Sequence, residues 1–356
     1  MAGPSGAVHR GVDPTRQHTR RSGAIYSSIL RRPFAASVSR TEKGKWIGFF
    51  EIVSQSCNPF SANSWRMPKI VGIHGIAQQY KGAHELRAEW LPALRDGLIA
   101  AGHGEAADAV DDDDLQVSFF GNLFRPRAAM GAEFPPSTAA DLRSVEEIEL
   151  LTELYDEAVA LEPALGPPTG ALGSVRVGVQ VMAERLLRSR TFARMISERA
   201  FVGNLKQVTQ FLAVPQIKDK VLDRVHEEID DNVRILIGHS LGSIVAYEYL
   251  CRYQPPRIEL LVTLGSPLGI PNVIFNRLTP TPREAGGTWP GAVTRWVNVA
   301  DPDDVVALRK KLADLFPPPP GLAQVTDELV DNGDKPHAIR PYLNAAETGA
   351  ALATML

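Results

Sequence analysis

Residues 235–247 read ILIGHSLGSIVAY and contain the pattern Gly-x-Ser-x-Gly from Gly238 to Gly242. The apolar, β-branched residues before the pattern predict a strand, and the Ala, Val and Tyr residues after it predict a helix. A serine that exposes its hydroxyl at such a junction needs a tight turn with strained backbone angles. The strand and the helix then come so close together that side chains at Gly238 and Gly242 would not fit. The stretch therefore predicts Ser240 at a sharp strand-to-helix turn.

The predicted helix would begin directly after Ser240. Unpaired backbone N–H groups and the helix dipole at that end favour negative charge on a nearby oxygen. This environment suits a serine that attacks a carbonyl group. One alternative is a serine that only caps the helix. A phosphate-cradling loop is less favoured, because the Gly-Lys-Ser/Thr ending of such loops is absent.

A serine hydroxyl is a weak nucleophile at neutral pH, so the hypothesis requires a base and a carboxylate that orients the base. His337 is the only histidine after His239 and lies in a late loop. The alternative is that His337 is an isolated histidine on the surface. Asp301, Asp303 and Asp304 follow a predicted strand, so the chain order Ser, Asp, His matches the order expected for this arrangement.

Asp304 is the first choice among these three aspartates. It is followed directly by the apolar residues 305–307, which can anchor the turn while the carboxylate points inward. Asp301 is the second choice, since it precedes Pro302 and can instead cap the turn. Asp303 is the third.

A second loop with a role at this site follows the predicted strand 70–73, where the sequence continues His-Gly-Ile. Gly75 permits a close approach of the backbone. The N–H groups of Ile76 and Leu241 are the expected donors to a negative oxygen, at about 2.7–3.1 Å. His74 is expected to fix this loop by hydrogen bonding, and a role as a second base is its alternative.

Strand and helix signals alternate along the chain from Lys69. Such alternation predicts an α/β fold with a mostly parallel sheet that helices cover on both faces. The expected strands are 70–73, 115–120, 233–237, 258–264 and 294–299, and the expected helices are 85–99, 241–253, one beginning near Val305, and 341–356.

The stretch from about 125 to 232 shows no strand pattern. Two helical tracts are expected within it, 142–161 and 175–229, the second with breaks near Gly203 and Pro215. We interpret this stretch as a helical cap insertion in a domain that spans 67–356. Additional helices packed on the scaffold away from any site are the alternative.

Residues 1–66 differ in kind from the rest of the chain. They hold ten Arg and Lys residues against three acidic ones, a net charge of +7, and lack sustained periodicity. We predict a disordered or wrongly assigned leader, with Met67 as the start of the protein. A basic arm that binds nucleic acid or an anionic membrane is the alternative. The remainder carries a net charge of −10, which disfavours nucleic acid as its partner.

The composition is that of an ordinary globular protein, with 356 residues, 44% of them hydrophobic and 22% charged. Cys57 and Cys251 lie far apart, so neither a disulfide framework nor a cysteine zinc site is expected. No membrane span and no secretory signal is recognised, which favours the cytoplasm. The acidic run 111–114 lacks the spacing of a calcium loop and predicts a solvated loop. No metal and no organic cofactor is expected.

Together these motifs resemble the α/β-hydrolase superfamily, and within it the lipase- and esterase-like members. The acid turn resembles that of fungal triacylglycerol lipases. The serine turn and the following strand resemble those of GPI-inositol deacylase-like and lecithin acyltransferase-like hydrolases. The matching stretches are Ile-His-Gly-Ile at 73–76, Gly-His-Ser-Leu-Gly at 238–242, Thr-Leu-Gly-Ser-Pro at 263–267, Asp-Val-Val at 304–306, and His337 with Tyr342 behind it.

This resemblance implies an α/β-hydrolase fold with Ser240 as nucleophile, Asp304 as acid and His337 as base. It also implies oxyanion donors at Ile76 and Leu241. Two features depart from the family pattern: the large helical insertion, and the Ile-Ala-Gln-Gln sequence that replaces a second glycine after Gly75.

The sequence therefore predicts a serine hydrolase that cleaves carboxylic esters through an acyl-serine intermediate. The size and apolar character of the cap favour small-molecule or lipid esters with hydrophobic acyl groups, and a transient contact with a membrane surface. A peptidase or a thioesterase would use the same residues. A binding module that keeps the fold without catalysis is the alternative from another class.

Overall fold

The structure is a computed structural model that describes residues 70–125, 138–167, 175–189 and 198–356. The predicted leader at 1–66 and the predicted start at Met67 lie outside the described residues, as do the cap segments 126–137, 168–174 and 190–197.

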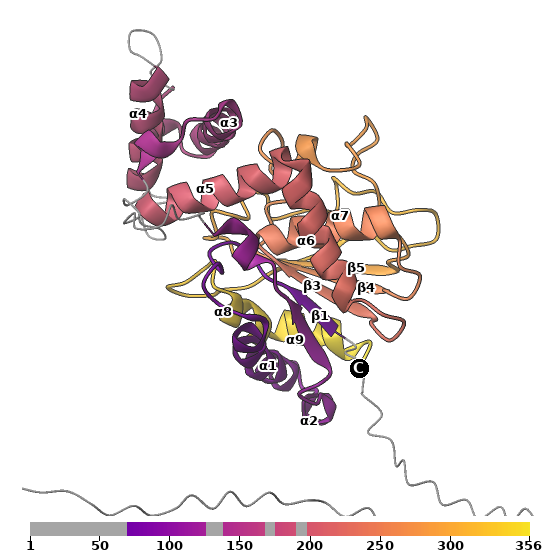
Figure 1. The fold of residues 1–356 in the computed structure, drawn as a ribbon. Coiled ribbons are helices and arrows are strands. Elements are labelled where there is room, and N and C mark those ends of the chain that lie inside the picture. The colour runs from indigo at the N-terminus through magenta and orange to yellow at the C-terminus, as the bar shows by residue number, and fades with distance from the viewer. Residues whose placement is uncertain (1–69, 126–137, 168–174, 190–197) are drawn as a thin grey trace, which may run out of the picture. The chain divides into compact units, whose positions relative to one another are not determined.

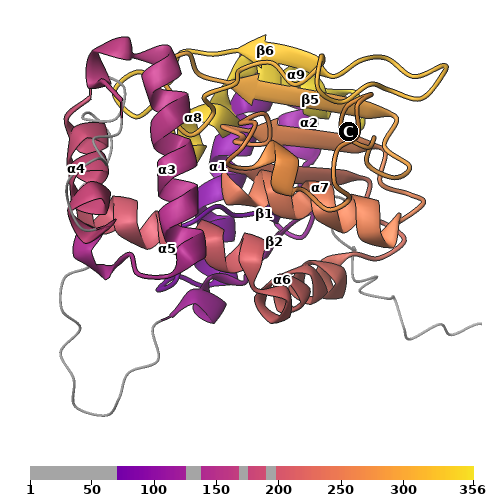
Figure 2. The same ribbon diagram turned by 90° about the horizontal axis from the view of Figure 1, so that it is seen from above.

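A parallel β-sheet forms the centre of the described chain (Figure 2). Its six strands stand in the order β2-β1-β3-β4-β5-β6, and each neighbouring pair is parallel. The strand order reverses between β1 and β3, and such a reversal opens a crevice at the carboxyl ends of the strands. The strands are β1 (Ile70–Ile73), β2 (Leu115–Ser118), β3 (Ile235–His239), β4 (Leu260–Leu264), β5 (Arg295–Ala300) and β6 (Thr326–Leu329).

Strand β3 illustrates why apolar runs form the centre of this sheet. Leu236 belongs to the hydrophobic cluster on one face, and Ile235 and Ile237 belong to the cluster on the other face. Successive side chains of a strand point to opposite faces, so a strand covered on both faces needs apolar residues at every position.

Helices cover both faces of the sheet (Figure 1). Three helices pack together on one face: α1 (Ala83–Ala100), α8 (Ile339–Asn344) and α9 (Ala346–Ala353). Helix α2 (Gly104–Ala109) packs against α1. The other face carries α7 (Leu241–Tyr253), against which α6 (Pro215–Glu228) packs.

The segment between β2 and α6 is helical where it is described. Helix α3 begins after Ser144, whose hydroxyl accepts the N–H of Glu147 at 3.1 Å in a capping box. Helix α5 packs against α3, α4 and α6. The elements are η1 (Gly121–Phe124), η2 (Ala139–Asp141), α3 (Val145–Leu161), η3 (Pro163–Leu165), α4 (Val175–Arg188) and α5 (Glu198–Ala213).

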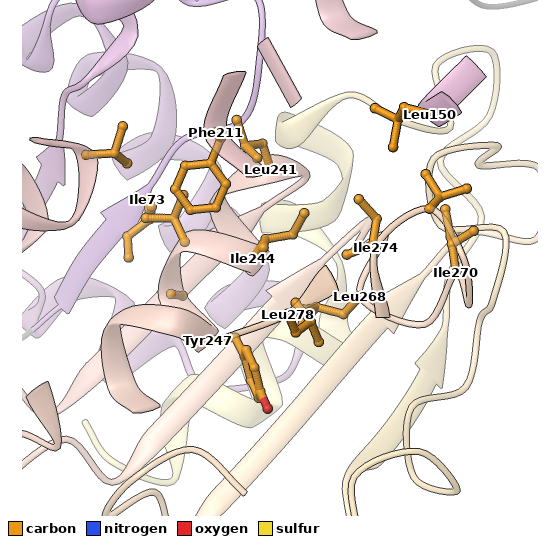
Figure 3. Close-up of a cluster of buried hydrophobic side chains, with 14 of the residues drawn as sticks. Ile73, Leu150, Phe211, Leu241, Ile244, Tyr247, Leu268, Ile270, Ile274 and Leu278 are labelled. Atoms are coloured by element: carbon orange, nitrogen blue, oxygen red, sulfur yellow. The ribbon is translucent and has the colours of Figure 1, made fainter. Parts of the chain in front are cut away.

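One hydrophobic cluster joins the sheet to these inserted helices (Figure 3). Ile73 of β1 and Ile244 of α7 lie in the same cluster as Leu150 of α3 and as Ile270 and Ile274, which follow β4. Helix α3 therefore shares a core with the face of the sheet that carries α7.

The predicted helix near Val305 is wrong. Residues 305–310 form turns and bends, with no helix. Side-chain carboxylates accept the backbone N–H groups there: Val306 donates to Asp304 Oδ1 and Leu312 donates to Asp327 Oδ1, both at 2.9 Å. Because these N–H groups bond to carboxylates, they do not form the ladder to preceding carbonyls that a helix requires.

Other element predictions differ in extent. The expected closing helix 341–356 is two helices, α8 and α9, separated by Ala345 in an extended conformation. The predicted break near Gly203 is wrong, because Gly203 lies inside α5, whereas the predicted break near Pro215 is present, because α5 ends at Ala213 and α6 begins at Pro215. Strand β6 was not predicted, because its sequence Thr-Asp-Glu-Leu carries no apolar run.

The acidic loop is only partly solvated. Asp112 and Asp113 are exposed, but Asp114 is buried, so the prediction is wrong for this residue. Its Oδ2 accepts the N–H of Asp111 at 2.9 Å, and this bond closes the turn that leads into β2.

Candidate active site

Ser240 lies at the carboxyl end of β3, beside the reversal of strand order. Its backbone angles, φ 55° and ψ −126°, are strained for a residue with a side chain. Its N–H donates to the Leu264 carbonyl at 3.0 Å, and its carbonyl accepts the N–H of Ser243 at 2.9 Å. Helix α7 begins at the next residue, so the predicted sharp strand-to-helix turn is present.

Three glycines leave room for this turn. A Cβ atom at Gly238 would lie 2.7 Å from the Gly242 carbonyl oxygen. A Cβ atom at Gly242 would overlap the Ile73 carbonyl oxygen, and one at Gly75 would lie 2.7 Å from Cβ of Ser240. These approaches explain why β1, the serine turn and α7 can meet only where side chains are absent.

The side chains of Ser240, His337 and Asp304 form a continuous row of hydrogen bonds. Ser240 Oγ lies 3.0 Å from His337 Nε2, and His337 Nδ1 lies 2.8 Å from Asp304 Oδ2. A carboxylate only accepts, so Nδ1 of the imidazole carries a proton and Nε2 is able to take the serine proton. Both distances lie within the range in which proton transfer occurs.

Asp304 is fully buried, and its carboxylate accepts several hydrogen bonds in addition to that from His337. Oδ2 also accepts the Tyr342 hydroxyl at 2.7 Å, and Oδ1 accepts the N–H of Val306 at 2.9 Å. Burial raises the pKa of Asp304, but the positive charge of His337 and these hydrogen bonds outweigh burial and hold the pKa below its usual value. The carboxylate is therefore ionised near neutral pH.

Of the three candidate acids, the structure brings Asp304 to the imidazole of His337. Asp301 accepts the N–H of Asp303 at 2.7 Å with Oδ1 and the N–H of Asn332 at 2.5 Å with Oδ2. Asp301 therefore closes its own turn and holds the loop that leads to His337. The side chain of Asp303 is exposed.

His239, the residue before Ser240, holds the loop that carries the candidate base. Its Nε2 donates to the His337 carbonyl at 3.0 Å, and the two ring centroids are 4.9 Å apart. Burial, reinforced by the charge of His337, lowers the pKa of His239 to about 3. No sequence pattern predicted this role of His239.

The N–H groups of Leu241 and Ile76 belong to residues that line a hollow together with Ser240. Leu241 is the first residue of α7, where the helix dipole favours negative charge. Within the described residues, neither N–H donates to another protein group. Both groups are therefore available to an oxygen bound beside Ser240.

His74 fixes the peptide that carries the N–H of Ile76. Its Nδ1 donates to the Gly75 carbonyl at 2.6 Å, and its Nε2 accepts the N–H of Phe120 at 3.2 Å. A trans peptide directs its C=O and N–H oppositely, so the bond to Gly75 also sets the direction of the Ile76 N–H. Burial lowers the pKa of His74 to about 4. With both ring nitrogens engaged, His74 fits the loop-fixing role better than the alternative role of a second base.

Two hollows meet at Ser240. One, of about 380 Å³, has a mixed lining, in which the polar residues Glu89, Asn204 and His337 lie beside apolar ones such as Trp90 and Ile339. The other, of about 100 Å³, is lined almost entirely by apolar side chains of α3, α5, the segment after β4 and the turn after Asp304. A molecule that reacts at Ser240 would thus meet a wall of mixed polar and apolar character on one side and an almost entirely apolar wall on the other.

Helix α5 contributes residues to both hollows. Asn204 lines both of them, whereas Phe201, Leu205 and Val208 line the apolar one. The place of Asn204 at the site was not predicted from the sequence. Apolar periodicity indicates which positions of an inserted helix are buried, but it does not indicate which face meets a serine in another part of the chain.

The described residues include no group of three or more His, Cys, Asp or Glu side chains arranged to hold a metal ion. None of the described helices combines the length and the apolar character needed to cross a membrane. Comparison with known proteins found no matching family model, no matching curated protein and no matching solved structure. Function is carried by the residues of a site and not by the fold, so the geometry around Ser240 is what bears on function here.

Proposed function

We propose that this protein is a serine hydrolase that cleaves carboxylic esters of hydrophobic acyl groups, on an α/β-hydrolase fold. The observation that carries the proposal is the hydrogen-bonded row from Ser240 Oγ to His337 Nε2, 3.0 Å, and from His337 Nδ1 to Asp304 Oδ2, 2.8 Å. A serine becomes an effective nucleophile when a base is within hydrogen-bonding reach and a third group orients that base.

Acylation begins when Ser240 Oγ attacks the ester carbonyl carbon and His337 Nε2 takes the hydroxyl proton. The carbonyl oxygen becomes an oxyanion, which the N–H groups of Ile76 and Leu241 bind. Asp304 stabilises the imidazolium of His337. The C–O bond to the alcohol then breaks, and the alcohol leaves with the proton from His337.

Deacylation repeats these steps with water as the nucleophile. His337 removes a proton from the water as it attacks the acyl-Ser240 carbonyl carbon. The second tetrahedral intermediate collapses, Ser240 recovers its proton from His337, and the carboxylic acid leaves. No step of this reaction requires a group beyond the residues named and water.

The two hollows support the choice of substrate class. The apolar hollow, bordered by Leu150, Phe201 and Ile274, suits an acyl chain. The larger hollow has a mixed lining that includes Glu89, Asn204 and His337, so it can accept the polar groups of the alcohol that leaves. An ester with an apolar acyl group and a more polar alcohol fits both surroundings.

The arrangement of the elements supports the fold proposal. Ser240 follows β3, Asp304 follows β5 and His337 follows β6, so the three residues come from the carboxyl ends of parallel strands. The serine lies beside the reversal of strand order, where open α/β sheets bind ligands.

A panel of nitrophenyl esters from acetyl to decanoyl tests the proposal. We expect turnover that is lost in Ser240→Ala, and kcat/KM that rises by about fourfold per added methylene until the apolar hollow is full. Matched thioesters and amides should react more slowly. A folded wild-type protein without turnover on any member would contradict the proposal and favour a binding module. A maximum at acetyl would contradict the hydrophobic acyl group.

A further inference from the structure

The loop after β1, residues 74–78, contains a strained backbone position. Ala77 has φ 63°, in the left-handed region that residues with a Cβ atom rarely adopt. Its neighbour Ile76 supplies one of the two N–H groups proposed to bind the oxyanion. A strained conformation persists only where surrounding contacts hold it in place.

A buried side chain of helix α5 provides one of those contacts. The N–H of Ala77 donates to Gln207 Oε1 at 3.2 Å, across 130 positions of the chain. Gln207 is 5% exposed, and its Nε2 donates to the Gly203 carbonyl at 3.3 Å, one turn earlier in the same helix. The amide of Gln207 is therefore fixed on α5 while its oxygen holds the loop.

The peptides on both sides of Ile76 are thus held. His74 holds the Gly75 carbonyl of the preceding peptide. The following peptide, which joins Ile76 to Ala77, is held at both of its polar groups. Its N–H, that of Ala77, donates to Gln207, and its carbonyl, that of Ile76, accepts Gln78 Nε2 at 3.2 Å. If the bond to Gln207 were lost, Ala77 could relax to a negative φ, and Ile76 would move with it.

We propose that Gln207 is a positioning residue through which inserted helix α5 keeps loop 74–78 in the conformation that binds the oxyanion. The inference rests on the proposed function. It assigns the insertion a part in the reaction beyond covering the site. Asn204, one turn before Gln207, lines both hollows, so the helix that holds the loop is also a wall of the substrate site.

The test compares Gln207→Met, which keeps the length of the side chain but removes the hydrogen-bonding amide, with Gln210→Met on the same helix. We expect kcat for a nitrophenyl ester to fall about tenfold in Gln207→Met, with KM changed by less than about twofold, because the oxyanion forms only during the reaction. Gln210→Met should retain wild-type kcat.

Ala77→Gly distinguishes a positioning role of Gln207 from a merely structural one. If Gln207 only stabilised the fold, Ala77→Gly would not restore kcat in Gln207→Met. Glycine adopts positive φ without strain, so Ala77→Gly combined with Gln207→Met should recover most of the lost kcat. Failure of a folded double variant to recover, or equal kcat in Gln207→Met and Gln210→Met, would overturn the inference.

Hydrogen exchange separates this inference from the proposed function, because it requires no turnover. Amides of residues 74–78 should exchange faster in Gln207→Met than in Gln210→Met, and unchanged exchange would overturn the inference even in an active enzyme. Wild-type protein that shows the expected exchange but cleaves no ester would instead contradict the proposed function. If Gln207→Met does not fold, Gln207→Asn, whose amide is one methylene too short to reach Ala77, should give the same faster exchange.

Discussion

Three histidines at the site show how surroundings give one residue type different tasks. His337 is 18% exposed and lies between an alcohol and a carboxylate, which suits proton transfer. His74 and His239 are held neutral by burial, and each fixes a loop through a backbone carbonyl. The sequence identified His337 because no other histidine follows His239. The role of His239 could not be predicted, because no sequence pattern indicates that its ring contacts the backbone carbonyl of His337.

The lowered pKa of His74 predicts a pH dependence of folding stability. In the unfolded chain this histidine takes up a proton near its ordinary value of 6.5, whereas in the folded protein it does so only near pH 4. The contribution of neutral His74 to the free energy of unfolding is therefore complete above about pH 6.5 and is lost as the pH falls toward about 4. The loss amounts to about 3 kcal/mol at pH 4, since each pKa unit corresponds to about 1.4 kcal/mol.

Urea unfolding of wild type and His74→Asn between pH 7 and 4 measures this contribution. Asparagine keeps a donor for the Gly75 carbonyl but does not titrate, so the free energy of unfolding should fall less steeply with decreasing pH in the variant. Asp304 does not interfere, because its pKa lies below its usual value of 3.8 and its contribution is lost only at lower pH. Parallel curves for the two proteins would show that His74 is not held neutral.

At the scale of elements, the contact between β1 and α7 sets the position of the serine. Gly242, in the first turn of α7, faces the Ile73 carbonyl of β1 so closely that no side chain fits. The Gly-x-Ser-x-Gly pattern predicted that no side chain fits at Gly242, because the pattern has a direct steric cause. It did not predict that the close neighbour of Gly242 is β1. Element bounds were less predictable where hydrogen bonds to side chains decide them, as in the turn after Asp304.

Gly242→Ala and Gly178→Ala make a matched pair that tests this contact. Both glycines lie in helices, but a Cβ atom at Gly178 would meet no atom within 4 Å. We expect Gly242→Ala to lower the free energy of unfolding by about 1–3 kcal/mol or more, because rigid backbone would have to move. Gly178→Ala should raise it by up to about 1 kcal/mol. Similar thermal unfolding of the two variants would contradict the proposed steric cause.

At the scale of the whole molecule, the order of the strands brings distant residues together. Ser240, Asp304 and His337 are far apart in sequence but follow β3, β5 and β6 of one parallel sheet, so their loops meet at one edge. Alternating apolar runs and helical periodicity made the α/β class predictable. The sequence ranked Asp304 before Asp301 and Asp303, but it could not show which carboxylate the turn directs at His337, and the structure shows that of Asp304.

The inserted helices were the least predictable part of the molecule. Their periodicity predicted helices, and Pro215 predicted the start of α6. The contact of Gln207 with the loop after β1 joins two segments whose local sequences carry no sign of each other. Such contacts arise from tertiary packing, which sequence patterns within one element do not encode.

The central claim is that His337 makes the Ser240 hydroxyl a nucleophile. Reaction with a fluorophosphonate, followed by mass spectrometry of the intact protein and its peptides, tests the claim most directly. We expect one adduct, on the peptide that contains Ser240, no adduct there in Ser240→Ala, and labelling at least about a hundredfold slower in His337→Asn. Folded wild-type protein that stays unmodified at Ser240, or that is labelled equally fast without His337, would contradict the account.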